Sequence, residues 1–255
     1  MAEAPGYVIL GRGRWAQRMR SIIASESRRV ATIDETRRQA SENDSLYVSR
    51  LVDAMKSSGA QIAWVCVTPG PHVSLMIQAA LDAGLHVVVE KPWYGSPEET
   101  HRLQSLAHQE RLVLAVHFEY LLLESVENWK RTFYPGEGLQ FAARFFLSRA
   151  DRSGIPPIDN LGCHLGSICE YAVPAAVISE FHCGYEQPDE RLVWLEKDGQ
   201  RISSINLFQG SERLIQDFMK KVEAACQTQA AVPFDLDFAL RVASRLNAYK
   251  ARASA

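Results

Sequence analysis

The sequence has few cysteines, and their spacing would support neither a disulfide framework nor a thiolate metal site. The five cysteines are odd in number and show no Cys-x-x-Cys spacing, whereas disulfide-rich domains and structural zinc sites need paired or regularly spaced thiols. No pair of histidines with a carboxylate stands at metal-ligand spacing either. We therefore expect reduced, structural cysteines and no catalytic metal.

Long apolar runs and an excess of one charge are also missing. No segment approaches the ~20 apolar residues of a membrane span, and the first residues lack the basic start and apolar stretch of a signal peptide. The formal net charge is −2, so there is no global field to attract nucleic acid or an anionic membrane. These absences predict a cytoplasmic protein with neither a nucleic acid nor a membrane as partner.

The first half of the chain alternates strand and helix patterns. Short runs rich in β-branched residues are almost continuously apolar, as expected for strands covered on both faces of a parallel sheet. Helical patterns fill the gaps, and one helix is expected from about Pro97 to Gln109 because Ser96 and Glu99 form a capping box. We therefore predict a doubly wound parallel α/β domain over residues 1–120. Its strands are expected at residues 7–10, 30–34, 62–67, 86–91 and 112–118.

After residue 120 the pattern changes to that of an α+β domain. Four segments are strand-like, and the last two flank Asp198-Gly199-Gln200, which indicates a hairpin. We predict a smaller domain over residues 121–255 with a mainly antiparallel sheet, whose C-terminal helix could pack back on the first domain. No Gly/Ser linker separates the halves, so a cleft between them is expected. The strands are predicted at 139–149, 177–185, 191–197 and 201–208, and helices at 161–171, 212–226 and 235–251.

A glycine-rich segment directly after the first strand carries the strongest motif. Residues 11–16, GRGRWA, fit the pattern GxGxxA at a strand-to-helix junction. Gly11 permits the tight turn, Gly13 lets the backbone approach a pyrophosphate, and Ala16 keeps the helix close to the sheet. The helix start offers amide donors to the phosphates, and Arg12 and Arg14 could add positive charge. The alternative is a glycine turn in a sheet protein that binds no nucleotide.

The residues after the second strand bear on the type of cofactor. Asp34 ends that strand near the expected ~20-residue separation, where a carboxylate could accept hydrogen bonds from the adenosine ribose of NAD. Arg37 and Arg38 follow directly and could instead hold the 2′-phosphate of NADP. The sequence therefore predicts NAD or NADP, with a lean towards NAD.

The glycine segment, the stretch VTPGPHVSLMIQAALDAGLHVVVEKPWYGSPEET and the segment NLGCH together resemble the Gfo/Idh/MocA oxidoreductases, the glucose-fructose oxidoreductase and inositol dehydrogenase group. The resemblance covers the whole nucleotide domain, and two closing helical segments also look like those of the family. It implies an N-terminal Rossmann domain that binds NAD or NADP. It also implies a C-terminal α/β domain whose open sheet often mediates homodimers or higher homo-oligomers.

The resemblance also assigns roles to single residues. In the family the lysine of the EKP motif, here Lys91, contacts substrate and the nicotinamide ribose, and the histidine of a DxGxH motif, here His164, commonly serves as acid or base. Lys91 ends a parallel strand, where ligands of such sheets bind. The plainer alternatives are a solvated lysine and a structural histidine. His72 lies near the cofactor in the family, although a turn-capping role fits it equally.

Three departures from the family pattern affect the predicted substrate site. Asn160 occupies the position of the family aspartate, and Asp159 stands one residue earlier, which turns a helical side chain by ~100°. Glu119 and Tyr120 replace the asparagine and arginine that often reach into the site. The last predicted strand runs almost directly into a helix, so the second sheet is expected to be short. The predicted substrate contacts are Lys91, Glu119, Tyr120, Asn160 and His164.

Together these features predict an NAD(P)-dependent oxidoreductase. It would transfer hydride between nicotinamide and a carbinol, carbonyl or imine carbon of a small polar metabolite, with Lys91 and His164 as candidate acid/base groups. The alternative is a non-catalytic nucleotide-binding regulatory or scaffold protein, which the Asn160 substitution and the short sheet favour. The predicted cofactor contacts are Gly11, Arg12, Gly13, Arg14, Trp15, Ala16, Asp34, Arg37, Thr68, Pro69, His72, Glu90 and Lys91.

Overall fold

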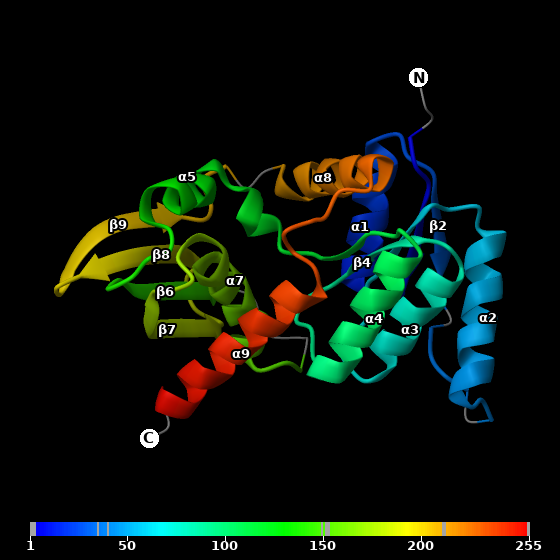
Figure 1. Cartoon of the computed structure of the whole chain (residues 1–255), viewed down its shortest axis with the longest axis horizontal. Coiled ribbons are helices and arrows are strands. Elements are labelled where there is room, and N and C mark those ends of the chain that lie inside the picture. The colour runs from blue at the N-terminus through cyan, green and yellow to red at the C-terminus, as the bar shows by residue number, and fades with distance from the viewer. Residues whose placement is uncertain are drawn as a thin grey trace. The chain divides into compact units, whose positions relative to one another are not determined.

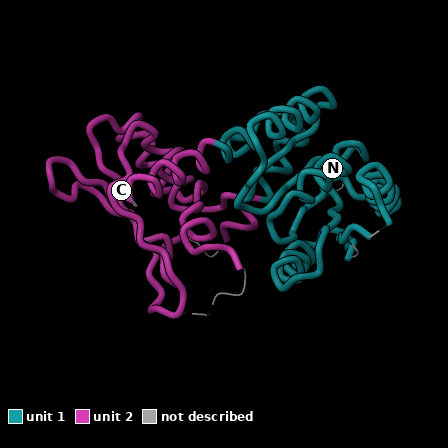
Figure 2. Tube along the Cα trace, turned by 90° about the horizontal axis from the view of Figure 1, so that it is seen from below, with its two compact units in different colours: residues 1–117, 219–240 teal, residues 118–218, 241–255 magenta. Residues whose placement is uncertain are grey.

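The chain consists of two compact units. The structure, a computed structural model, describes residues 4–34, 36–39, 41–148, 150, 154–210 and 213–253. Unit 1 comprises residues 1–117 and 219–240, and unit 2 comprises residues 118–218 and 241–255 (Figure 2). The first division falls near the predicted boundary at residue 120. Residues 219–240 return to unit 1, whereas the prediction placed them in a domain over residues 121–255 whose C-terminal helix could pack back on the first domain.

Unit 1 contains a five-stranded sheet in which every pair of neighbouring strands is parallel, in the order β2-β1-β3-β4-β5. This confirms the predicted doubly wound sheet. Four strands are shorter than the predicted apolar runs, because the last residues of those runs have already left the sheet and form the turns at its carboxyl edge. The strands are β1 (Tyr7–Leu10), β2 (Val30–Ile33), β3 (Ile62–Val65), β4 (His86–Val89) and β5 (Leu114–Val116).

Helices connect these strands and pack beside one another. The helices α2, α3 and α4 form a row of neighbours (Figure 1). Helix α4 begins as predicted, because the Ser96 hydroxyl accepts a hydrogen bond from the Glu99 amide at 3.1 Å. The helices of the first half are α1 (Arg14–Ser25), α2 (Asp44–Ser57), α3 (His72–Asp82) and α4 (Pro97–Gln109).

Helix α8 (Leu214–Thr228) explains why a late segment of the chain belongs to unit 1. Its Glu223 is buried and accepts a hydrogen bond from the Tyr7 hydroxyl of β1 at 2.7 Å. The same carboxylate accepts two bonds from Arg28, at 2.6 Å from Nε and 2.7 Å from Nη2. Further on, the carbonyl of the buried Phe234 accepts a bond from the Val116 amide of β5. Spacing along the chain does not reveal such long-range partners.

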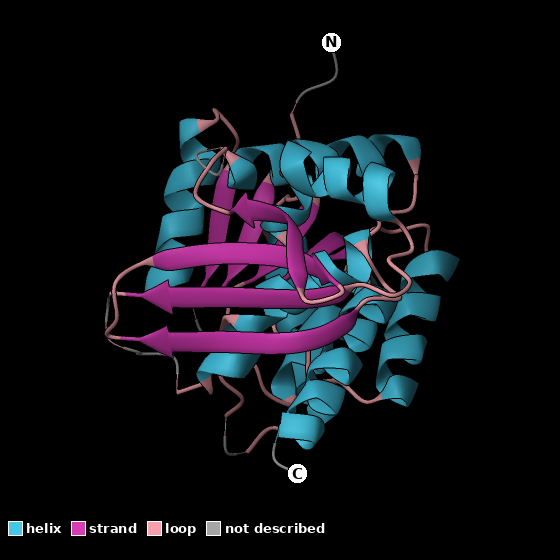
Figure 3. Ribbon diagram, turned by 90° about the vertical axis from the view of Figure 1, so that its left-hand side faces the viewer, coloured by secondary structure: helices cyan, strands magenta, loops and turns pink. Residues whose placement is uncertain are grey.

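Unit 2 contains a four-stranded sheet in the order β7-β6-β8-β9 (Figure 3). Only the β6–β7 pair is parallel, which confirms a mainly antiparallel sheet. Asp198 and Gly199 both have positive φ angles, 51° and 75°, as a tight hairpin between β8 and β9 requires. The strands are β6 (Gln140–Leu147), β7 (Val177–Tyr185), β8 (Glu190–Lys197) and β9 (Gln200–Asn206).

The helices of unit 2 are short, apart from the last. Helix α7 packs against β6 and β7, and the apolar side chains Phe141 and Phe145 of β6 are buried while Arg144 is exposed. The helical elements are η1 (Glu119–Leu122), α5 (Glu124–Phe133), α6 (Pro157–Asn160), α7 (Gly162–Ala172) and α9 (Leu236–Ala253). Residues 149 and 212, at the ends of two predicted elements, lie outside the described residues.

Burial accounts for the chemistry of the cysteines. All five are free. Desolvation raises the pKa of the Cys169 and Cys183 thiols to about 12, which leaves little thiolate at neutral pH. None of the helices in the described part of the chain has the length and apolar character that a membrane crossing requires.

The buried carboxylate of Glu223 generates a stability prediction. We expect Glu223→Ala to lower the free energy of unfolding by about 3–5 kcal/mol, because the substitution leaves the partly buried Arg28 without its partner. Tyr7→Phe, which removes one hydroxyl, should lower the free energy of unfolding by about 1 kcal/mol. Urea unfolding followed by circular dichroism measures both. The exposed Asp53→Ala serves as the control, and an equal effect of Asp53→Ala and Glu223→Ala would contradict the prediction.

Candidate functional site

The glycine segment forms a narrow turn between β1 and α1. Gly11 has φ +125°, and a β-carbon there would lie 2.5 Å from the carbonyl oxygen of Cys66, so only glycine fits. Gly13 caps α1 without a side chain, and a β-carbon at this position would meet no atom within 4 Å. The first turn of α1 holds no acidic residue, and its amides have no partner within the helix. This open, donor-rich helix start fits the pyrophosphate of a dinucleotide.

The side chains around this turn divide into packed and exposed groups. Ala16 is buried against the sheet, as the motif predicts, whereas Arg12 and Arg14 are exposed. The Trp15 ring lies under the guanidinium of Arg18, with 5.2 Å between the guanidinium carbon and the ring centroid. On the sheet side it stacks on the buried imidazole of His117 with a centroid distance of 6.2 Å. Trp15 therefore joins the glycine turn to the carboxyl end of β5.

A buried polar cluster occupies the carboxyl edge of unit 1. Glu90, the residue after β4, accepts a hydrogen bond at Oε1 from the Trp64 indole at 3.0 Å. The same oxygen lies 3.1 Å from Nδ1 of His117, whose side chain is 1% exposed. Sequence analysis placed Glu90 among the cofactor contacts and missed His117. The available signal was a single polar residue inside the apolar run LAVHF.

The environment of Glu90 favours its ionised form. Burial by itself would raise the pKa of this carboxyl group, but the charge and the hydrogen bond of His117 outweigh it, and the pKa is lowered from its usual range. Lys91 is the next residue and lies at the same edge, half-buried, where the sequence placed it. The edge therefore presents a lysine beside a carboxylate whose side chain is 10% exposed.

A cavity of about 270 Å³ lies next to this edge, within unit 1. Its walls come from the turns that follow β3 and β4 and include Pro69 and Glu90 of the predicted cofactor contacts. Trp93 forms an apolar wall and is held in place by a hydrogen bond from its indole to the Thr100 hydroxyl at 2.8 Å. His72 begins α3, and its ring lies against Gly70 of the preceding turn, while Thr68 belongs to the same connection.

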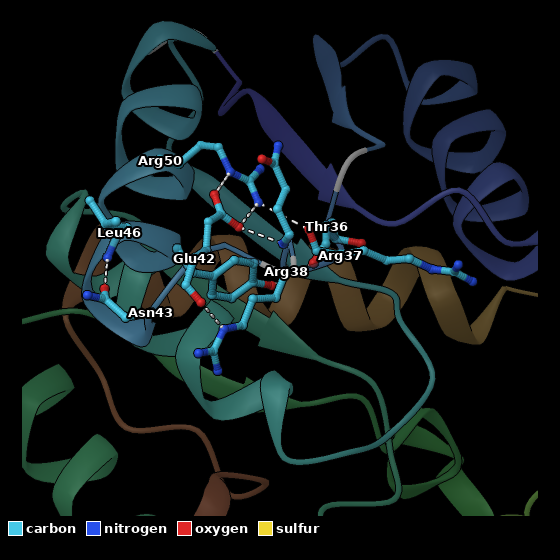
Figure 4. Close-up of polar contacts among 9 residues, drawn as sticks. Thr36, Arg37, Arg38, Glu42, Asn43, Leu46 and Arg50 are labelled. Carbon is cyan, nitrogen blue, oxygen red and sulfur yellow. Dashed lines mark hydrogen bonds and ion pairs between the residues drawn. The ribbon is translucent and has the colours of Figure 1, made fainter.

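The segment after β2 forms a second polar region of unit 1 (Figure 4). Glu42 accepts hydrogen bonds from Arg50, which lower the pKa of the Glu42 carboxyl group. Arg38 is bound to Asp44 at 2.6 Å and to the backbone carbonyl of Glu42 at 2.7 Å. Arg37 is exposed, and Figure 4 shows its side chain extending away from this cluster. Of the two arginines proposed for a 2′-phosphate, Arg38 is therefore already bound by the protein.

Unit 2 brings together three of the predicted substrate residues. His164 lies on α7 and is buried, with its Nδ1 3.9 Å from Oε2 of Glu119. The Tyr120 ring meets the imidazole edge-on, with 4.9 Å between the ring centroids. The Tyr120 hydroxyl accepts a hydrogen bond from Nη1 of Arg191 at 2.9 Å. Sequence analysis did not find Arg191, because its neighbours come from other elements.

Asn160 and Asp159 bind residues outside the cluster of His164, Glu119 and Tyr120. The Asn160 amide donates a hydrogen bond to the Tyr185 hydroxyl at 2.6 Å. Asp159 forms an ion pair with Lys250 at 2.8 Å, so it does not replace the family aspartate, in keeping with the expected ~100° turn of one helical residue. Across the described ranges, no group of three or more His, Cys, Asp and Glu residues lies close enough to hold a metal ion.

The largely buried carboxylate of Glu90 generates a pH-dependent stability prediction. A carboxyl group with a lowered pKa in the folded state stabilises the fold above its unfolded pKa of about 4.3, and this contribution is lost as the pH falls through the folded pKa. Glu90→Gln keeps an acceptor for Trp64 but removes the charge. We expect a destabilisation on the order of 2 kcal/mol near neutral pH that shrinks in acid. Urea unfolding over pH about 3–7 tests this, and a pH-independent difference would contradict it.

Comparison with known proteins finds a family match over the nucleotide-binding part of the chain. Residues 6–118 match a family model described as the oxidoreductase family with an NAD-binding Rossmann fold. Biliverdin reductase A of Mus musculus is 29% identical over 161 residues, which cover 61% of this chain and 54% of that protein. The chain thus matches about half the length of this curated relative.

Two solved structures extend the likeness to the whole fold. UDP-N-acetylglucosamine 3-dehydrogenase GnnA from Acidithiobacillus ferrooxidans is similar with a TM-score of 0.77 and 15% identity, covering 96% of this chain and 97% of that one. GenD2 from gentamicin A biosynthesis, in complex with NAD, has a TM-score of 0.73 and 15% identity, covering 99% and 95%. Both units of this chain therefore have the fold of these proteins.

Proposed function

We propose that this chain is an NAD(P)-dependent oxidoreductase, because residues 6–118 match the Gfo/Idh/MocA model of the oxidoreductase family with an NAD-binding Rossmann fold. Its substrate would be a small polar metabolite, a sugar derivative or biosynthetic intermediate, that reacts at a carbinol, carbonyl or imine carbon. The observation that carries the proposal is the turn at Gly11 and Gly13, which opens the start of α1 to a phosphate group.

The residues of unit 1 would hold the cofactor along the carboxyl edge of the sheet. The first amides of α1 would bind the pyrophosphate, with Arg12 and Arg14 adding positive charge. Asp34, exposed at the end of β2, would accept hydrogen bonds from the adenosine ribose, which favours NAD. When bound, the nicotinamide ring supplies or accepts the hydride.

Lys91 and His164 are the proposed proton-transfer residues. Lys91 would exchange a proton with the reacting oxygen or nitrogen of the substrate, and the buried Glu90 would keep a negative charge next to it. For His164, Oε2 of Glu119 lies 3.9 Å from Nδ1, beyond hydrogen-bond distance, and Nε2 of the imidazole would exchange the proton. Glu119, Tyr120 and Asn160 are kept as proposed substrate contacts.

The second candidate function is nucleotide binding without turnover. It is favoured by Asn160 in the position of the family aspartate, since an amide cannot relay a proton to His164, and by the four-stranded second sheet. It would retain the cofactor site of unit 1 and lose the reaction. Substrate turnover therefore separates the two functions, whereas cofactor binding does not.

Substitution of Lys91 tests the reaction. We expect Lys91→Ala to lower kcat by about 100-fold or more, because a positioned acid or base contributes that much, while the Kd for the coenzyme changes only a few-fold. Absorbance of the reduced nicotinamide follows turnover on a panel of sugars, ketones and imines, and fluorescence follows binding. The exposed Lys56→Ala is the matched control. Tight coenzyme binding without turnover of any compound would favour the non-catalytic function.

Residues after β2 test the choice of coenzyme. We expect Asp34→Ala to weaken NADH binding by about 10-fold, the effect of losing hydrogen bonds to a charged group. Arg37→Ala should leave NADH binding unchanged and weaken NADPH binding, because only the 2′-phosphate would reach this guanidinium. Fluorescence titrations with both coenzymes measure the two constants. Stronger binding of NADPH than of NADH by the unaltered protein would contradict the lean towards NAD.

A further inference from the structure

Arg191 has different electrostatic partners from three other arginines of unit 2, Arg144, Arg241 and Arg245. Arg144 lies 3.9 Å from both Glu180 and Glu190, and Arg241 and Arg245 both contact Glu170. Within the described part of the chain, no carboxylate lies within 4.0 Å of the Arg191 guanidinium. Arg191 is half-buried, and its Nε is buried without a hydrogen bond.

The partners that Arg191 does have hold its side chain without neutralising its charge. The guanidinium carbon lies 5.2 Å from the ring centroid of Phe145 and 4.5 Å from that of Phe208. Nη1 donates its hydrogen bond to the neutral hydroxyl of Tyr120. Burial of part of the Arg191 cation costs desolvation free energy. The contacts with two rings and one hydroxyl offset this cost only in part. An anion bound at this position would supply the missing compensation.

The same aromatic residues join Arg191 to His164. Tyr120 contacts His164 through its ring and Arg191 through its hydroxyl. Phe145 also lies between them, with its ring centroid 5.6 Å from that of the imidazole. Arg191 is therefore one side chain away from the proposed proton-transfer residue. Phe208, at the outer side of the guanidinium, is 36% exposed, so this end of the cluster reaches the surface.

We propose that Arg191, together with Tyr120, binds a carboxylate group of the substrate beside His164, an inference that rests on the proposed function and narrows the substrate class to a carboxylate-bearing polar metabolite. The guanidinium is planar and pairs with carboxylates in the plane of its fork. Glu119 carries a negative charge in the same cluster, next to His164. One cation with a carboxylate nearby suits a singly charged anion better than a phosphate dianion.

Three sugars that differ in the group at C6 test whether the site requires a carboxylate. D-Glucuronate, D-glucose and D-glucose 6-phosphate would be titrated into the full-length protein by calorimetry, with acetate as a minimal probe at constant ionic strength. We expect glucuronate to bind better than glucose, and Arg191→Gln to weaken glucuronate binding by about 10- to 100-fold, the worth of a hydrogen bond to a charged group. Glucose 6-phosphate binding more tightly than glucuronate, or glucuronate binding unaffected by Arg191→Gln, would overturn the proposal, as would no binding of either carboxylate by the unaltered protein.

A matched control separates a binding role from a structural one. Arg201 lies on the same sheet and also stacks on an aromatic ring, with its guanidinium carbon 4.5 Å from the centroid of Trp194. Arg201→Gln should leave glucuronate binding unchanged. Arg191→Met keeps apolar volume between the rings, and we expect it to leave the melting temperature unchanged or raised while abolishing the response to acetate. A large drop in melting temperature would show that Arg191 is structural.

Failure of this inference can be distinguished from failure of the proposed function. The carboxylate site lies wholly in unit 2, and the coenzyme site wholly in unit 1. If the protein binds NADH and reduces a neutral compound while carboxylates do not bind, only the inference is wrong. If carboxylates bind through Arg191 but neither coenzyme binds, the oxidoreductase function is wrong and the anion site stands.

Discussion

The close approach of Gly11 to the carbonyl of Cys66 is the constraint on which the nucleotide edge of unit 1 depends. This contact ties the turn after β1 to the end of β3, and the Cys66 amide bonds back to the carbonyl of Leu10 at 2.9 Å. With the turn held this close, α1 starts directly above the sheet and its first amides stay open. Any side chain at position 11 would push the turn away and displace the helix start.

The two units differ in the partners that surround their buried or half-buried charged side chains. In unit 1 the carboxylate of Glu90 is matched by His117 and Trp64, and the carboxylate of Glu223 by Arg28 and Tyr7. Within each pair, attraction between the partners offsets much of the free energy lost when the charges leave water. Removal of one partner leaves the other charge without this compensation. Among the described residues of unit 2, the Arg191 guanidinium contacts two aromatic rings and a hydroxyl, and no carboxylate lies within 4.0 Å of it. A protein that keeps such a cation gains little stability from it, which is why a ligand is the simpler explanation.

Unit 1 is built from distant parts of the chain, and this affects how its sheet is completed. The fifth strand would end the sheet with an open edge, but the carbonyl of Phe234 bonds to Val116 there. Helix α8 adds the buried Glu223 network next to β1. Residues 219–240 therefore complete the packing of the unit that the first 117 residues form.

Local patterns in the sequence determined the parallel sheet, the hairpin at Asp198-Gly199, the start of α4 and the glycine turn, because each depends on residues close together in the chain. Periodicity and capping act over a few residues, so they can be recognised without knowing the tertiary structure. The pairing of Glu90 with His117, the docking of Glu223 and the cluster of Tyr120, His164 and Arg191 were decided only by tertiary structure. They join residues on different elements, and strand order and helix packing, which no local spacing encodes, place those elements side by side.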